Sequence, residues 1–138
     1  MEKKVKLKGA IVKKIETTDQ GVIIHAKQYK PLETTCPYCG SKTHHLRYTR
    51  SRTYKDSPIV YNTDTYLALQ RLEGKCRNCN KSFMLPSNLV HDGTRMTINL
   101  HQFIMFLLSN PYNLSNEDIA KEATVSENTI LKIKQSMS

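Results

Sequence analysis

The chain has 138 residues, a mass of 15.9 kDa and a formal net charge of +9. Hydrophobic residues make up 38% of it, with no Trp, 5 Gly and 5 Pro. This length allows one ordinary domain or two small ones, and the composition excludes a collagen-like or a low-complexity disordered chain. The apolar content is low for a fold held together by burial alone, so we expect a second source of stability.

The positive charge lies in the first two thirds of the chain. The excess of Lys and Arg over Asp and Glu is +4 in residues 1–35 and +6 in residues 36–90, but −1 in residues 91–138. A surface of this sign attracts polyanions such as nucleic acid. No stretch approaches the roughly 18 apolar residues that span a bilayer, and the first residues lack the apolar core of a signal peptide. We expect no membrane partner and a cytoplasmic location, or a nuclear one in a host with a nucleus.

Two strands are expected before the first cysteine. Apolar residues alternate with lysines within residues 5–15, and strand-forming residues resume at 22–26. Asp19, Gln20 and Gly21 supply a turn between them. We predict an N-terminal hairpin that packs on the unit that follows it.

Four cysteines form two pairs with two residues inside each pair: Cys36 and Cys39, then Cys76 and Cys79. Such spacing lets a tight turn point both thiolates at one ion, and two pairs complete a four-thiolate shell. Disulfides are disfavoured by a reducing cytoplasm and by the strain of so small a ring. A redox-active dithiol is disfavoured too, because such a motif would occur once and this chain has two pairs. We predict one structural Zn²⁺, because four thiolates leave no open position for catalysis. His44 and His45 are expected on the surface or around the site rather than as ligands.

Zinc would supply the stability that the modest apolar content leaves in doubt. Structural zinc contributes on the order of 10 kcal/mol in small peptides. Four thiolates around one Zn²⁺ carry a formal charge of about −2, so the loaded chain keeps about +7. The attraction to polyanions survives this correction.

The 36 residues between Cys39 and Cys76 are predicted to form strands. Residues 45–54 are rich in Tyr, Thr and Arg, residues 59–61 are short and apolar, and residues 66–72 are mostly apolar, with a turn at 62–64. Two cysteine knuckles at the ends of a small antiparallel sheet make a zinc ribbon.

Basic side chains in this ribbon alternate with tyrosines. Arginine forks suit phosphate oxygens, and aromatic faces can stack on bases. The alternative is a solvated sheet face, but nine basic residues against three acidic ones exceed what solubility requires. The predicted phosphate contacts are Arg47, Arg50, Arg52, Arg71, Lys75 and Arg77.

The strand pattern ends within residues 81–97, and three helices are predicted after it. The first covers 97–109 and stops at Asn110-Pro111. Ser115 caps a helix over 116–122, and after a break at 123–125 Ser126 caps a third helix from 127 to about 136. This is the pattern of a helix-turn-helix. The expected fold is α+β, with a hairpin and zinc-ribbon domain over 1–90 and a helix-turn-helix domain over 91–138.

Periodicity assigns two faces to the third helix. Ile130, Ile133 and Met137 should face the other helices. The opposite face would meet a DNA major groove, where Asn and Gln pair with adenine and Lys with guanine or phosphate. An ordinary three-helix bundle with a solvated polar face is the alternative. The predicted groove-facing residues are Ser126, Asn128, Thr129, Leu131, Lys132 and Gln135.

These motifs resemble those of a known family. The segments that carry the resemblance are Cys36-Pro-Tyr-Cys39-Gly, Lys55-Asp56-Ser57-Pro58-Ile59, residues 67–72 leading into Cys76-Arg-Asn-Cys79 and Phe83, and Ile119 through Ile130. Over residues 30–137 the chain resembles the N-terminal DNA-binding region of bacterial insertion-sequence transposases of the ISL-three type. The resemblance implies binding to the terminal inverted repeats of a mobile element, in a nucleoid-associated setting.

Two departures from that family shape the expectations. Its members continue into a large catalytic domain with an Asp-Asp-Glu metal site, for which this chain has no room, so we expect no strand cleavage and no enzyme activity. The helix-turn-helix position that the family often fills with Gly is Thr124 here. A β-branched residue at positive φ would be strained by about 1–3 kcal/mol, so either the turn differs or packing tolerates the strain.

Double-stranded DNA is the leading expected partner, with no small-molecule substrate. A stand-alone zinc-ribbon and helix-turn-helix regulator or an RNA-binding zinc ribbon remains open, the latter because of the Tyr/Arg sheet. A protein-interaction module is a third alternative. It would make a homodimer possible, with Phe103, Phe106 and Leu107 in its interface.

Overall fold

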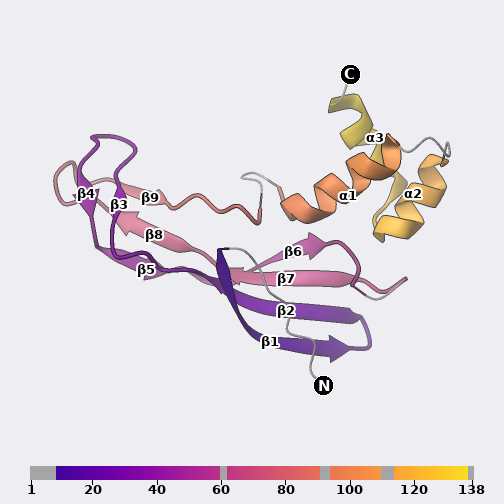
Figure 1. Cartoon of the computed structure of the whole chain (residues 1–138), viewed down its shortest axis with the longest axis horizontal. Helices are drawn as coiled ribbons and strands as arrows, with labels where there is room; N and C mark the ends of the chain where they lie inside the picture. The colour runs from indigo at the N-terminus through magenta and orange to yellow at the C-terminus, as the bar shows by residue number, and fades with distance from the viewer. Residues whose placement is uncertain (1–8, 60–61, 91–93, 110–113, 137–138) are drawn as a thin grey trace.

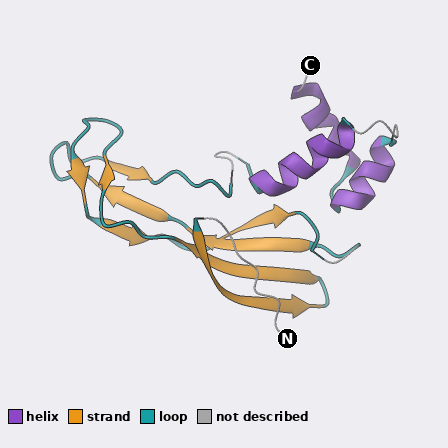
Figure 2. Ribbon diagram, viewed as in Figure 1, coloured by secondary structure: helices purple, strands orange, loops and turns teal. Residues whose placement is uncertain are grey.

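The computed structural model describes residues 9–59, 62–90, 94–109 and 114–136. Within them the chain is α+β, with nine strands followed by three helices. The two larger sheets lie end to end along the long axis, and the three helices lie together at one end of the molecule (Figure 1). Figure 2 shows this separation of strands from helices most directly. The expected fold class, a β-rich N-terminal part followed by three helices, is confirmed.

The larger sheet has four strands. In spatial order they are β1 (Ala10–Thr18), β2 (Gly21–Gln28), β7 (Thr65–Gln70) and β6 (Arg52–Asp56). β1 and β2 form the predicted antiparallel hairpin, but β2 also pairs in parallel with β7. The hairpin therefore belongs to the central sheet by main-chain hydrogen bonds and does not merely pack on it. Gly21 allows the close pairing, because its φ is +138° and a Cβ would overlap the carbonyl oxygen of Asp64.

Two smaller sheets carry the cysteines. The three-stranded sheet contains, in spatial order, β5 (Leu46–Tyr48), β8 (Leu72–Lys75) and β9 (Ser82–Met84), and the two-stranded sheet pairs β3 (Thr34–Thr35) with β4 (Lys42–Thr43). β9 lies in a segment that was predicted to contain no strand. A short strand was also predicted at residues 59–61. Ile59 lies in a bend rather than in a strand, and residues 60–61 lie outside the described part of the chain.

Two segments that were predicted as single strands are each divided between sheets. Residues 45–54 give β5 and β6, and residues 66–72 give β7 and β8 with a break at Arg71. At this break the Arg71 carbonyl accepts a hydrogen bond from the Thr49 N–H at 2.8 Å. The chain crosses from one sheet to the other at this point on both segments, so a single continuous strand is not possible.

Three separate hydrophobic clusters hold these parts. The central sheet buries Ile24, Ala26, Tyr54, Leu67, Leu69 and Val90, the cysteine-bearing sheets bury Leu46, Leu72, Phe83 and Leu85 with Cys36 and Cys76, and the helices bury a third set. A fully buried Leu or Phe contributes about 1.5–3 kcal/mol. The cluster in the cysteine-bearing sheets has few such residues, and the buried Cys36 and Cys76 complete it.

The helices are α1 (Ile98–Leu108), α2 (Asn116–Ala123) and α3 (Glu127–Ser136), within one residue of the predicted ranges. Hydroxyl oxygens of Thr97, Ser115 and Ser126 accept hydrogen bonds from main-chain N–H groups in the first turns. As predicted, Ile130 and Ile133 are buried among the helices. Met137 and the predicted stop at Asn110-Pro111 lie outside the described residues.

The turn between α2 and α3 is a Schellman motif. The Val125 N–H donates to the Ala120 carbonyl at 3.0 Å, and the Thr124 N–H donates to the Lys121 carbonyl at 3.3 Å. Thr124 has φ 57° and ψ 41°, which is the left-handed region. Packing therefore tolerates the strained β-branched residue, because Val125 packs against the helical cluster and holds the turn closed.

Asp56 and Thr97 join the helices to the central sheet. The Thr97 hydroxyl donates to Asp56 Oδ1 at 2.7 Å and accepts from the Leu100 N–H at 3.1 Å. Asn99 Nδ2 also donates to the Ser57 hydroxyl at 2.6 Å. The Asp-Ser-Pro element thus fixes the start of α1 against the end of β6.

Candidate metal centre and basic surface

The two cysteine pairs lie in loops of the same backbone design. The Cys36 N–H donates to the Ser41 carbonyl at 2.8 Å, and the Cys76 N–H donates to the Lys81 carbonyl at 3.0 Å. The residue after each second cysteine has a left-handed conformation, with φ 77° at Gly40 and 62° at Asn80. Gly and Asn are the residues that adopt this conformation most readily, so the sequence itself favours both loops.

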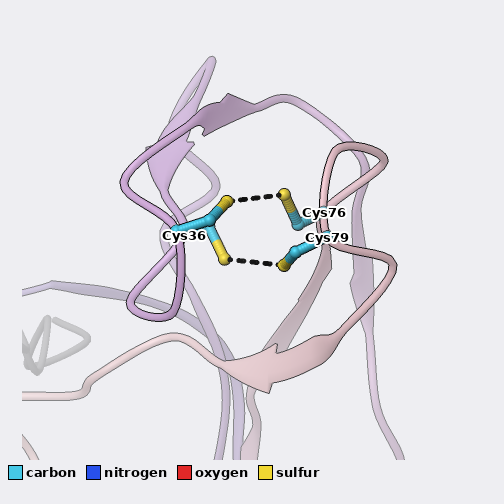
Figure 3. Close-up of side chains that lie close together, drawn as sticks. Cys36, Cys76 and Cys79 are labelled. Carbon is cyan, nitrogen blue, oxygen red and sulfur yellow. Dashed lines mark hydrogen bonds between the residues drawn. The ribbon is translucent and has the colours of Figure 1, made fainter.

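The loops bring all four sulfurs together (Figure 3). The sulfurs lie within 4.8 Å of one another, with 3.6 Å between Cys36 and Cys79 and 3.5 Å between Cys39 and Cys76. These distances exceed a disulfide bond of about 2.05 Å and the cysteines are free. A tetrahedral ion with metal–sulfur bonds of about 2.3 Å needs sulfurs about 3.8 Å apart. The cluster could therefore hold one metal ion with small adjustments.

The thiol pKa values show how the site would respond to a cation. The hydroxyl and main-chain N–H of Ser41 hydrogen-bond the Cys39 sulfur and lower its pKa to about 6. The Lys81 N–H lowers the pKa of Cys79 too, but burial and the neighbouring cysteine sulfurs outweigh it and raise the pKa to about 11. Four close thiols cannot all ionise alone, so the tetrathiolate form requires a bound cation.

Further side chains surround the two loops. Asn78 Nδ2 donates to the Ser41 hydroxyl at 3.0 Å, across from one loop to the other, and lies 3.8 Å from the Cys39 sulfur. His44 is exposed and His45 half-buried, and their rings are 4.7 Å apart. Neither histidine belongs to the group of side chains that could hold the ion.

The predicted phosphate contacts fall into three groups. Four of them are exposed: Arg50, Arg52, Lys75 and Arg77. Arg47 is exposed but its guanidinium donates to Glu73 at 3.0 Å. Arg71 is only 8% exposed and its guanidinium donates to the Leu85 carbonyl at 2.7 Å. Its position differs from the expected surface contact, because the side chain fills the junction between the sheets.

A cavity of about 580 Å³ lies at this junction. Residues from β6, β7, β8 and β9 line it, together with the segment that leads into α1. Arg95, which the sequence analysis did not single out, is among its lining residues. Arg95 lies in a connecting segment, where the sequence has no periodic pattern that would indicate its position. A main-chain hydrogen bond brings it to the cavity, because the Lys55 N–H donates to the Arg95 carbonyl at 2.7 Å.

The outer face of α3 carries the predicted groove-facing residues. Asn128, Leu131, Lys132 and Gln135 are exposed, and Thr129 is half-buried. The hydroxyl groups of Ser126 and Thr129 are 3.0 Å apart, and the Ser126 oxygen also accepts from the Thr129 N–H. The face is polar apart from Leu131, which is 43% exposed.

The residues of the suggested dimer interface have different environments. Leu107 is buried among the three helices and Phe103 packs against the same cluster. Phe106 alone of the three is exposed, at 64%. Among the described helices, none is both long enough and apolar enough to cross a bilayer.

Comparison with known proteins adds no relative: no family model, curated protein or solved structure matches the chain. The function must therefore be inferred from the metal cluster, the basic surface and the exposed helix face of this chain.

Proposed function

We propose that the protein is a zinc-dependent DNA-binding module in which a zinc ribbon supports a helix-turn-helix. The observation that carries this proposal is the exposed face of α3, which presents Asn128, Lys132 and Gln135 after a tight turn and a capped helix start. A helix of this kind fits a major groove, where amide and ammonium groups meet base edges.

Zinc is the metal that the donor set favours. Four thiolates select zinc or an iron–sulfur cluster over hard cations, and one ion suits sulfurs that are 3.5–3.6 Å apart across the loops. In this proposal Cys36, Cys39, Cys76 and Cys79 hold the ion, which stabilises the small cluster around Leu72 and Phe83. Its role is structural.

In this proposal the helical part and the β-rich part bind different features of the DNA. The helical part has almost no net charge, so α3 contributes base discrimination more than attraction. The β-rich part carries the exposed cations Arg50, Arg52, Lys75 and Arg77, which would contact phosphates without reading sequence. Because its motifs resemble those of the transposase family, we propose that the DNA target is the end of a mobile element in a bacterial cytoplasm. In this proposal the chain recognises the DNA and does not cleave it.

Selection from random duplexes followed by sequencing would identify the site, and anisotropy titrations would then compare specific with random DNA. We expect Lys132→Ala to reduce the preference for the selected site about tenfold or more. Lys134→Ala is the matched control, because this exposed lysine lies two residues away and therefore on the other side of the helix. Equal effects of both substitutions, or no selected sequence at all, would contradict the proposal.

One observation favours an RNA-binding ribbon as a second candidate. Tyr38 is 59% exposed at the tip of the first loop, with Lys81 Nζ 4.8 Å from its ring centre. An exposed ring beside a cation can stack on an unpaired base. Tighter binding to single-stranded RNA than to any duplex, with loss on Tyr38→Ala, would favour this candidate over DNA.

A further inference from the structure

The cavity at the junction of the two larger sheets is lined by four arginines: Arg50, Arg52, Arg71 and Arg95. They come from three segments of the chain that the fold brings together: residues 50–52, Arg71 and Arg95. Its volume of about 580 Å³ lies in the usual range of ligand-binding clefts. We name this feature the arginine cleft.

The charge in the arginine cleft is strongly unbalanced. Glu73 is its one acidic lining residue, and Arg47 from outside the cleft already pairs with that carboxylate at 3.0 Å. Within the described ranges, Arg50, Arg52 and Arg95 form no ion pair. Like charges held together repel one another and raise the local concentration of anions. The cleft is therefore built for a ligand with several negative charges.

Hydrogen bonds to neighbouring strands and loops hold three of these arginines in place. Arg52 lies in β6 opposite Leu69, and the Arg95 carbonyl accepts from the Lys55 N–H at 2.7 Å. Arg71 is fixed by its bond to the Leu85 carbonyl. A cleft with a rigid frame loses little conformational entropy when it binds, apart from that of the exposed guanidinium groups.

We propose that the arginine cleft binds consecutive phosphodiester groups of the DNA backbone, outside the base pairs that α3 would read. This deepens the proposed function and rests on it. Guanidinium forks match phosphate oxygens in pairs, whereas the buried floor of Leu69 and Tyr54 offers nothing that would recognise a base edge. The cleft adds affinity and register but no sequence preference.

The test is the salt dependence of binding by the zinc-loaded full chain. Each arginine that contacts a phosphate contributes about 0.9 to the slope of log K against log salt. The triple variant Arg50→Gln, Arg52→Gln, Arg95→Gln should therefore lower the slope by about 2–3 and weaken binding to any duplex about eightfold per arginine at about 0.1 M salt. Arg71 is left unchanged because it is part of the core. All variants are checked for zinc content and circular dichroism.

The control removes charge far from the cleft. Lys14→Gln changes an exposed residue of β1, which lies three strands away from β6 in the sheet. The slope change per charge removed should be much smaller for this variant than for the cleft. An equal slope change per charge in the control and in the triple variant, or an unchanged slope in the triple variant, would overturn the cleft proposal. Lys132→Ala would still test the role of α3 independently. Wild-type binding that does not weaken with salt would instead overturn the proposed DNA binding.

Discussion

Thr124 gives the sharpest test of the turn between α2 and α3. Its φ of 57° is a conformation that costs a non-Gly residue about 1–2 kcal/mol. Its hydroxyl recovers part of this cost through a 2.7 Å hydrogen bond to the Ala123 carbonyl. We therefore consider two substitutions, Thr124→Gly and Thr124→Ala, because both remove the hydroxyl and the β-branch and differ in the Cβ alone.

The expected magnitude follows from this difference. Glycine has no Cβ penalty in the left-handed region, but it loses about 0.5–1 kcal/mol more entropy on folding than alanine. The net effect makes Thr124→Gly more stable than Thr124→Ala by about 0.5–1 kcal/mol. At an exposed helical position the order reverses, and glycine is about 1 kcal/mol worse than alanine. Gln102, which is exposed in the middle of α1, is such a position.

Urea unfolding of the zinc-loaded protein, followed by circular dichroism of the helices, gives the four free energies of unfolding. We expect the free energy of unfolding of the Gly variant minus that of the Ala variant to be positive at position 124 and negative at position 102. The same sign at both positions would mean that Thr124 is not held in the left-handed region in solution. The Schellman turn, and with it the orientation of α3 on α2, would then be wrong.

Three further predictions concern the frame around the site. Gly74→Ala should cost about 1–3 kcal/mol, because the new Cβ would lie 2.7 Å from Cζ of Phe83 in the buried cluster; an unchanged urea midpoint would show that the ring can move away. Asp56→Ala should cost about 2–3 kcal/mol by leaving the Thr97 hydroxyl without its acceptor, and Asp56→Asn should cost less because an amide oxygen can still accept; equal losses would point to a packing effect. A chelator should unfold the cysteine-bearing sheets, and metal affinity should fall as the pH falls because the thiols protonate; elemental analysis that finds no metal in fully folded protein would exclude this role.

The sequence predicted best what is decided within one turn of the chain. The helix ranges were correct to one residue because Ser115, Ser126 and the apolar spacing of Ile130 and Ile133 act locally. The spacing within each cysteine pair predicted the two loops for the same reason, since each loop closes over six residues. The convergence of the two loops is not local, and it was predicted only because four thiolates complete the shell of one metal ion. Metal identity and DNA binding stay predictions.

What the sequence did not predict depends on partners far away in the chain. The parallel pairing of β2 with β7 joins segments about 40 residues apart, and no local pattern marks it. Arg71 was taken for a surface contact because its charge is visible in the sequence, whereas its burial depends on Leu85 and on the break between two sheets. Arg95 was overlooked because it enters the cavity through its pairing with β6.

One segment connects the parts of the molecule that the proposed function requires to act together. The Lys55 N–H donates to the Arg95 carbonyl and the Lys55 carbonyl accepts from the Thr97 N–H at 2.9 Å, so the residues before α1 extend the sheet beside β6. The same two contacts place Arg95 in the arginine cleft and fix the start of α1, which packs on α2 and α3. In the proposed complex, the backbone of this short segment would set the distance between a phosphate in the cleft and a base at α3. A loss of the Asp56–Thr97 bond should consequently weaken specific binding more than random binding, because each half could still contact DNA but the two would no longer share one register.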